Sequence, residues 1–348
     1  MRRRGVGKKP GEDRERPVTA VEAGSKAKGD QKDVARYIAK RVVLLVIIII
    51  FVSFFAFLLV HLLPGNPATT ILGPNSTPQN VAAVNKQLGL NKPLFQQYFI
   101  WMGNVFQGDL GQSYTTHQAT TSIIAQSFPI DLELIILSQI FAFAVAFPLA
   151  MHSARRPYRF FDQAANSGTF AMLALPPFVI APVLVLLFAV HWHVFPGPAS
   201  YVPLTQNFWS NVHTMVLPSI VLALGGIVVY YRLLRNDLIS TLQEDFITMA
   251  RSKGLSDRRI MWRHALRPSS ISLLASAGVT IGSLIAGTFI VELLLQMPGL
   301  GYQLISSVNQ DDYTVVQGIT LFVAIAIVLI NFIFDFLFTI VDPRIARE

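Results

Sequence analysis

Six long apolar stretches constrain this chain more than any other feature. Each is about 20 residues or longer, the length that an α-helix needs to cross the hydrocarbon core of a bilayer. The first contains VVLLVIIIIFVSFFAFLLV, without the polar stripe of a soluble core helix. The sequence therefore predicts an all-α integral membrane protein. Its six expected transmembrane helices are Val42–Leu63, Leu132–Met151, Thr169–Val190, Val216–Leu234, Ile271–Leu295 and Val315–Ile340.

The composition agrees with this prediction and excludes several kinds of site. Only 14% of the residues are charged and 52% are hydrophobic, whereas a soluble domain has about 25% charged residues. The absence of cysteine rules out disulfides and thiolate metal sites. No segment fits G-x-x-x-x-G-K-[ST], not even around Gly7-Lys8-Lys9. We therefore expect no catalytic site, no metal, no cofactor and no nucleic-acid partner for this chain.

The distribution of Lys and Arg predicts the orientation. Of the 28 such residues, all except Lys86 and Lys92 lie in the N-terminal tail, in segments 152–164 and 232–270, or at the C-terminus. Cytoplasmic loops carry the excess of Lys and Arg. Both termini should thus be cytoplasmic, and segment 63–128 should be an extracytoplasmic loop.

The N-terminal tail and the loop 63–128 lie outside the membrane and differ in character. Residues 1–33 have mixed charge and few large apolar side chains, which is typical of a disordered tail attracted to anionic lipid, whereas 34–348 should form the transmembrane domain. Loop 63–128 looks ordered, with helices expected around Val81–Leu88 and Gln96–Phe106.

Prolines 148, 176, 177, 182 and 218 should bend the transmembrane helices.

Segment 232–270 is the most informative region. Arg232–Arg251 reads as a continuation of the fourth transmembrane helix, which Gly254 then ends. Ser256 is a suitable N-cap for a second short helix, Asp257–Leu266. That helix has arginines on one face and Ile260, Met261 and Ala265 on the other. Two interpretations remain open on these grounds: an amphipathic helix that touches lipid headgroups, or a docking element for a partner.

This pattern resembles the cytoplasmic coupling loop in the membrane subunits of ATP-binding-cassette importers. Their general motif is E-A-A-x(3)-G-x(9)-I-x-L-P, of which Ala250, Gly254 and Leu266 match. The chain departs from it at Thr248, Met249, His264 and Arg267. It is more similar to the dipeptide, oligopeptide and nickel branch, with E-D-[FY]-[IV]-x-x-A-R-x-K-G-L-S and then R-H-A-L-R. The matching runs are Glu244–Ile247, Ala250–Ser256 and Arg263–Arg267.

Further landmarks of that branch occur in order over about Val34–Arg347. They include Pro64-Gly65-Asn66-Pro67, Gly108-Asp109-Leu110-Gly111, Val291-Glu292, Pro298-Gly299-Leu300-Gly301 and Asp342-Pro343-Arg344. The chain departs at Pro177, where serine is usual, and at Leu295-Gln296-Met297, where aromatic residues are usual. Both departures lie near the expected translocation path.

The resemblance implies a permease subunit of a bacterial plasma-membrane importer for di- or oligopeptides. Expected partners are a homologous second permease, two ATPase subunits that hold ATP and Mg, an extracytoplasmic binding protein and lipids. Expected ATPase-coupling residues are Glu244, Asp245, Ala250, Arg251, Lys253, Gly254, Leu255, Ser256, Asp257, Arg258, Arg259, Arg263, His264 and Leu266. Expected translocation-path residues are Pro176, Pro177, Phe178 and Glu292.

Other functions remain as alternatives. The same family includes permeases for nickel and other small solutes. An ion-coupled secondary transporter would need ionisable residues within the membrane, for which Asp131, Glu133, Glu292 and Asp335 are the candidates. A membrane enzyme is disfavoured because the histidines are scattered and lack acidic partners at metal-ligand spacing.

Overall fold

A computed structural model describes residues 41–58, 61–62, 66–87 and 89–341, and their side chains except that of Gln87 and those beyond Phe334. The chain divides into one part that ends at Ile48 and another that begins at Ile49. Residues 41–48 of the first part begin the Arg41–Leu58 helix. The tail predicted for residues 1–33 lies outside the described residues.

The described residues confirm the all-α prediction. They contain no β-strand, only an isolated bridge between Gln112 and Ala119. The expected helices around 81–88 and 96–106 are α3 and α4. The elements after the first helix are α2 (Pro67–Leu72), η1 (Gly73–Asn75), α3 (Pro78–Gln87), α4 (Leu94–Phe106), α5 (Thr120–Arg155), α6 (Phe160–Ala174), α7 (Pro177–Leu184), η2 (Val185–His191), α8 (Phe208–Thr241), α9 (Asp245–Ser252), α10 (Asp257–Arg259), η3 (Ile260–Ala265), α11 (Leu266–Leu295), α12 (Leu300–Asn309) and α13 (Tyr313–Val341).

Five of the six expected membrane helices are confirmed as single helices long and apolar enough to cross a membrane. The third, Thr169–Val190, falls on α6 and on α7 with η2, which are long and apolar enough only when taken together and which meet at a bend of 102°. It is therefore not one straight helix, as the sequence predicted. Leu175 is pushed into an extended conformation by the proline that follows it, and Pro177 begins α7. Prolines 148, 182 and 218 instead lie inside α5, α7 and α8.

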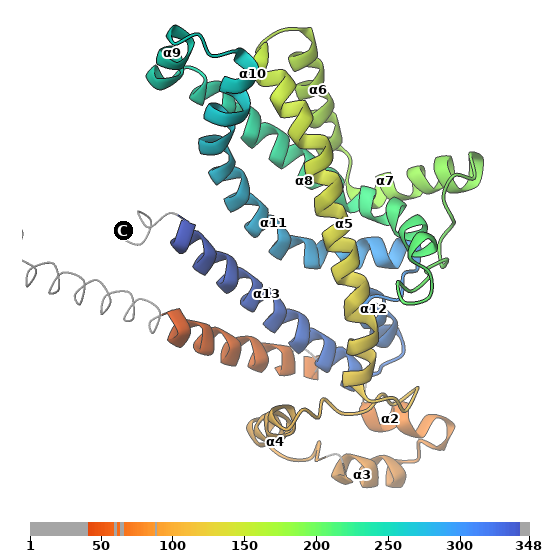
Figure 1. Ribbon diagram of the computed structural model, residues 1–348. Coiled ribbons are helices and arrows are strands. Elements are labelled where there is room, and N and C mark those ends of the chain that lie inside the picture. Colours follow the sequence, from red (N-terminus) through yellow and green to blue (C-terminus); the bar gives the residue numbers. More distant parts are fainter. Residues whose placement is uncertain (1–40, 59–60, 63–65, 88, 342–348) are drawn as a thin grey trace, which may run out of the picture. The chain divides into compact units, whose positions relative to one another are not determined.

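Small side chains allow the central helices to approach closely. Helix α5 packs along α8, and α11 packs against α8 (Figure 1). On α5, Ala142, Ala146 and Ala150 recur every four residues and are buried. A Cβ on Gly226 of α8 would lie 3.2 Å from the Cβ of Ala142. Such small-residue faces favour association between helices in lipid, where apolar surface alone gives little preference. Helices α2 to α4 lie at one end of the packed helices α5, α8 and α11, and α9 and α10 lie at the other end (Figure 1).

Two buried carboxyl groups hold the start of α12. The Asp131 Oδ2 atom accepts a hydrogen bond from the Leu300 amide at 3.0 Å, and the Glu292 Oε2 atom accepts one from the Gly301 amide at 2.8 Å. Both side chains are buried. The first amides of a helix have no partner within it, and its N-terminus favours negative charge. Asp131 on α5 and Glu292 on α11 therefore fix α12 to the bundle.

Gly301 must lack a side chain at this junction. A Cβ there would overlap the Cα and the ring of Phe289 on α11. We expect Gly301→Ala to destabilise the protein by about 1–3 kcal/mol, the usual cost of overpacking. Thermal unfolding of the purified chain should show this as a lower melting temperature. Gly225→Ala on α8 is the matched control, since no atom lies within 4 Å of its added Cβ. Equal melting temperatures for the two variants would contradict the prediction.

Candidate functional site

Residues Glu244–Leu266, called here the coupling segment, form two helical pieces joined at Gly254. Helix α9 ends at Ser252, and Gly254 has φ of 77°, which L-residues rarely adopt. The Leu255 amide then donates to the Ala250 carbonyl at 3.3 Å. The predicted break at Gly254 is thus confirmed, and it reverses the chain so that α10 and η3 can follow α9.

Two predictions about this region are wrong. Arg232–Arg251 is not one helix, because α8 ends at Thr241 and a turn leads to Glu244 in extended conformation. Asp257–Leu266 is not a separate helix either, since it continues into a helix that runs to Leu295. Its η3 part is a π-helical turn that precedes Pro268, whose missing amide and bulky ring disturb regular helix geometry. Ser256 holds the N-cap position but makes no capping bond.

One side of the coupling segment is packed into the protein. Ile247, Ile260 and Met261 are buried, and the last two belong to the apolar side that the sequence predicted. They share one hydrophobic cluster with alanines of α5 and with Tyr231 and Leu238 of α8. The coupling segment therefore shares its buried side with both helices.

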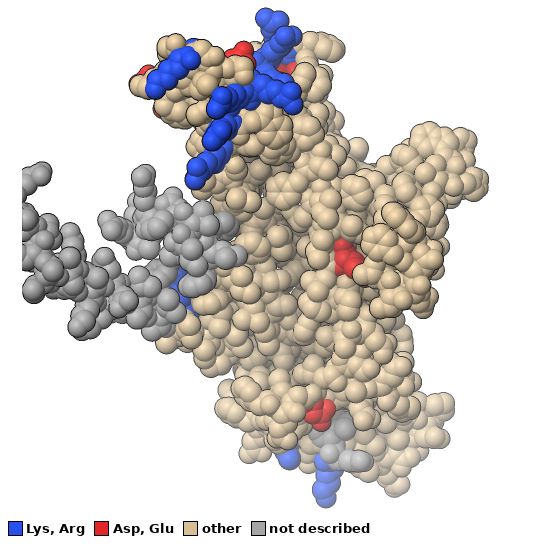
Figure 2. Space-filling view, viewed as in Figure 1, with Lys and Arg blue, Asp and Glu red and all other residues tan. Residues whose placement is uncertain are grey.

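The opposite side is exposed and basic. Figure 2 shows Lys and Arg crowded at the end that carries α9 and α10, whereas the middle of the face shown has almost none. The ion pair between Arg251 and Asp257 is 3.9 Å long, with side chains 53% and 94% exposed. Exposed pairs of this kind contribute little stability. These charges are thus free to meet a partner.

The structure divides the predicted coupling residues between these two sides. Ala250 is buried, and Leu255, His264 and Leu266 are half-buried. The exposed members are Glu244, Asp245, Arg251, Lys253, Gly254, Ser256, Asp257, Arg258, Arg259 and Arg263.

Three large side chains of the exposed side were missed by the sequence analysis. Phe246 and Met249 are 46% and 60% exposed on α9, and Trp262 is about half exposed on η3. Phe246 and Met249 are three residues apart, so they share one helix face. Hydropathy could not separate them from the buried Ile247 and Ala250, although α9 is amphipathic. Exposed aromatic side chains among arginines are typical of protein interfaces.

An ion pair that the sequence did not reveal ties α6 to α8 near this end. The Arg235 Nε and Nη2 atoms donate to the two carboxylate oxygens of Asp162, each at 2.5 Å. The Asp162 side chain is 2% exposed and that of Arg235 is 12% exposed. Asp162 also accepts the Tyr158 amide at 2.8 Å. Because 73 positions separate the partners, spacing alone could not pair them.

Of the expected path residues, three lie together and one elsewhere. Pro176, Pro177 and Phe178 form the bend between α6 and α7. Near the bend is an apolar cavity of about 440 Å³, lined by residues of α6, α7, η2 and α8. Glu292 lies elsewhere, on α11, where it is buried against the start of α12 and accepts a hydrogen bond from the Gly301 amide.

The remaining ionisable candidates also have protein partners where they are described. The Glu133 Oε2 atom accepts a hydrogen bond from the side-chain amide of Asn211 at 2.9 Å. Burial, with the nearby Glu133 charge, raises the pKa of Tyr201 to about 12. The side chain of Asp335 lies outside the described residues. Across the described residues, no three His, Asp or Glu side chains gather as metal ligands would.

Comparison with known proteins identifies the family. Residues 146–347 match the binding-protein-dependent transport system inner membrane component, and residues 34–135 match the N-terminal region of such membrane components. The dipeptide transport system permease protein DppB of Escherichia coli K12 is 33% identical over 336 residues, covering 90% of this chain and 99% of DppB. The oligopeptide transport system permease protein AppB of Bacillus subtilis is 32% identical over 314 residues, with the same coverage.

A putative peptide transport system permease protein of Brucella abortus is 33% identical over 311 residues, covering 89% of this chain and 99% of the relative. The chain belongs to the binding-protein-dependent transport system inner membrane components, the permease subunits of ATP-binding-cassette importers. It is a multi-pass protein of the bacterial plasma membrane.

Loss of the Asp162–Arg235 pair should strongly destabilise the protein. Asp162→Ala leaves the Arg235 charge buried without its partner, which costs about 3–5 kcal/mol in folded proteins. Asp257→Ala removes the exposed pair and should change stability by less than about 1 kcal/mol. Chemical unfolding of both variants in detergent checks this contrast. Similar losses in the two variants would show that the buried pair is no anchor.

Proposed function

We propose that this chain forms half of a translocation path for di- or oligopeptides, and that a homologous membrane subunit forms the other half. The observation that carries this proposal is the relatives' agreement: three proteins named for peptide, dipeptide or oligopeptide transport match about nine tenths of this chain. The bend between α6 and α7, with its adjoining apolar cavity, is a suitable wall for the path.

One ATPase subunit would dock on the exposed side of the coupling segment, and a second ATPase on the matching segment of the other permease. The arginines of the coupling segment can make bidentate contacts with carboxylates, and Phe246 and Met249 can fill apolar hollows of the partner. ATP and Mg would be held by those subunits, since this chain lacks a phosphate-binding loop sequence. In this proposal the chain is a transport subunit and not itself an enzyme.

Movement would pass from the ATPases to the path through packed contacts. When two ATPases close on ATP, each would carry its coupling segment with it as a rigid body. Because η3 continues into α11 and the segment packs on α5 and α8, those helices must follow. The path would then alternate between inward-open and outward-open states, which the nucleotide biases differently.

In this proposal the coupling segment is cytoplasmic, because cytoplasmic loops carry the excess of Lys and Arg. Helices α2 to α4 then face outward, where an extracytoplasmic binding protein would deliver the peptide. The first helix and other exposed apolar side chains would contact lipid or the second permease subunit.

Uptake by the reconstituted complex tests the proposed function. The test uses proteoliposomes that contain both permeases, both ATPases and the binding protein. Labelled dipeptide should be transported only when ATP and Mg are present on the side of the membrane that carries the ATPases. A protonophore should not reduce that uptake. Uptake driven by an ion gradient, or uptake of nickel without peptide, would refute the proposal.

The exposed apolar pair of α9 should be needed for coupling. We expect Phe246→Ala combined with Met249→Ala to reduce ATP-driven dipeptide uptake at least about tenfold, because buried aromatic anchors dominate binding at interfaces. The melting temperature of the permease should stay unchanged, since both side chains are exposed. Phe208→Ala is the control, an exposed phenylalanine at the other end of α8. Normal uptake in the double variant would show that the ATPase docks elsewhere.

A further inference from the structure

The turn between α5 and α6 brings arginines and aromatic side chains together on one exposed surface. Arg155 ends α5, Phe160 begins α6, and residues 156–159 link the two helices. The turn lies at the same end of the molecule as α9 and α10 (Figure 1). We call residues 155–161, with the sequence RRPYRFF, the basic turn.

The arginines of the basic turn have no opposite charge beside them. Arg155, Arg156 and Arg159 are exposed, and none forms an ion pair with a carboxylate of the described residues. The acidic residue nearest to them in the sequence is Asp162, which is buried and already paired with Arg235. The basic turn therefore offers three positive charges to a partner that brings negative ones.

Aromatic side chains stand among these charges. Phe160 is 87% exposed and Tyr158 is 74% exposed. The ring of Phe161 is partly covered by His152, with 4.4 Å between the ring centroids. An exposed phenylalanine forgoes the free energy that burial of its ring would give. Aromatic rings beside arginines are typical of the boundary between lipid headgroups and acyl chains, where the rings leave water and the charges do not.

The backbone of the basic turn is held from inside the protein. Tyr158 has φ of 63°, a left-handed conformation that residues other than glycine rarely adopt. Its amide donates to the Asp162 Oδ2 atom at 2.8 Å, and its carbonyl accepts from the Gln163 side chain at 3.1 Å. Because Asp162 is itself paired with Arg235, these bonds tie the turn to α8. The exposed side chains are therefore carried by a backbone of defined shape.

Two helices place the basic turn at the depth of lipid headgroups. The expected membrane stretch of α5 ends at Met151, and Arg155 follows four residues later, about 6 Å along the helix. Asp162 pairs with Arg235, the first residue after the expected stretch Val216–Leu234 of α8. The headgroup region is about 5–8 Å thick on each side of the hydrocarbon core. The two helices thus agree in placing the turn among lipid phosphates.

The helix that follows distinguishes the basic turn from the coupling segment. Phe160 and Phe161 open α6, which forms a candidate membrane span together with α7 and η2. Their rings therefore stand where acyl chains begin. Phe246 and Met249 of the coupling segment instead lie on α9, a helix of eight residues outside the candidate spans. Lipid is thus favoured over a protein as the partner of the basic turn.

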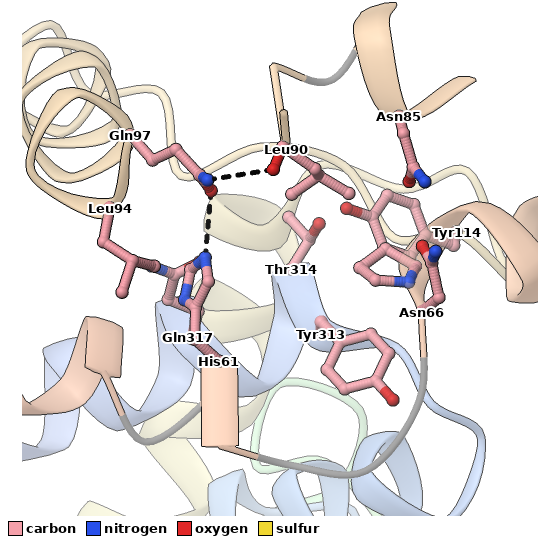
Figure 3. A pocket seen from close by; sticks show the side chains of 11 residues that line it. His61, Asn66, Asn85, Leu90, Leu94, Gln97, Tyr114, Tyr313, Thr314 and Gln317 are labelled. Atoms are coloured by element: carbon pink, nitrogen blue, oxygen red, sulfur yellow. Dashed lines mark hydrogen bonds between the residues drawn. The ribbon is translucent and has the colours of Figure 1, made fainter. Parts of the chain in front are cut away.

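The opposite end of the molecule differs in charge. Figure 3 shows a cavity of about 340 Å³ there, whose lining consists of amides, hydroxyls, an imidazole and apolar groups, without Lys, Arg, Asp or Glu. Lys86 and Lys92 line a neighbouring cavity, but they share it with Asp109. An anionic ligand is therefore favoured at the basic turn and not at that end.

We propose that the basic turn binds an anionic phospholipid of the bilayer, such as phosphatidylglycerol. Arg155, Arg156 and Arg159 hold its phosphate, because planar guanidinium groups form paired hydrogen bonds with phosphate oxygens. Tyr158 and Phe160 place their rings beside the glycerol and the upper acyl chains. The inference goes beyond the proposed function, since lipid bound at this turn requires neither peptide nor ATP.

A fluorescent label beside the basic turn reports lipid binding at this place alone. The chain contains no cysteine, so Ala164→Cys can be labelled at one position. Ala164 is exposed and lies four residues after Phe160, on the same face of α6. The labelled full-length chain is placed in phosphatidylcholine nanodiscs with a small fraction of spin-labelled lipid, which quenches the label on contact. Spin-labelled phosphatidylglycerol should quench it much more than spin-labelled phosphatidylcholine.

Removal of the arginines should abolish this selectivity. Arg155→Gln, Arg156→Gln and Arg159→Gln, each in the labelled chain, should lower the phosphatidylglycerol preference about fivefold, which corresponds to about 1 kcal/mol per basic residue at an anionic surface. The triple variant should quench equally with both lipids. Lys92→Gln is the matched control, because it removes an exposed cation at the opposite end and should leave the preference unchanged.

The ring of Phe160 gives a second test that does not alter charge. Phe160→Trp should keep the affinity for phosphatidylglycerol, whereas Phe160→Ser should lower it at least about threefold, because the ring no longer leaves water on binding. All of these side chains are exposed, so the melting temperatures in phosphatidylcholine should stay unchanged. If the arginine variants unfold, the two Phe160 variants decide.

Three results would overturn the proposal. The first is equal preference for phosphatidylglycerol in the triple variant and its labelled parent. The second is displacement of the lipid by excess inorganic phosphate, which would make the turn a site for free anions. The third is a triple variant that keeps its lipid preference but loses the ATPase from the assembled transporter, which would make the turn a protein contact. Because peptide uptake is not measured, failure of the proposed function would leave these readouts unaffected.

Discussion

The packing of the coupling segment against α5 and α8 determines which of its side chains are buried and which stay exposed. Ile247, Ile260 and Met261 enter the cluster that contains Tyr231 and Leu238. Burying a side chain of this size contributes roughly 1.5–3 kcal/mol where water is the alternative. Between helices in lipid that gain is largely absent, so close alanine and glycine contacts take over. One chain thus uses two kinds of cohesion, one in the coupling segment and one between the membrane helices.

Buried polar contacts join the ends of neighbouring helices. Such contacts are directional, whereas apolar packing alone does not fix how one helix is oriented on another. Arg235 and Asp162 lock α6 to α8 at one end. Asp131 and Glu292 seat the start of α12 near the other. Each contact satisfies groups that would be costly to leave unpaired. Rigidity of this kind is what a subunit needs if it moves as a body.

Much of the fold was predictable, and the failures have physical causes. Hydropathy located the membrane helices, and Gly254 marked the reversal after α9, because length and backbone freedom are local properties. The bend at Leu175-Pro176 was anticipated as a distortion, but its 102° turn depends on how α7 packs. The exposure of Phe246, the pairing of Arg235 with Asp162 and the burial of Glu292 all arise from contacts distant in sequence. The sequence predicted the basic loop as the docking element, but it could not say which side chains of that loop are exposed and which are buried.

The continuous helix from Asp257 to Leu295 has a further consequence for timing. At 1.5 Å per residue its 39 residues span about 58 Å, and Glu292 near its far end binds the amides of α12. No loop interrupts this connection. A shift at the arginine-bearing end should therefore reach α12 without delay, so the two faces of the membrane would change in one concerted event and not in sequence.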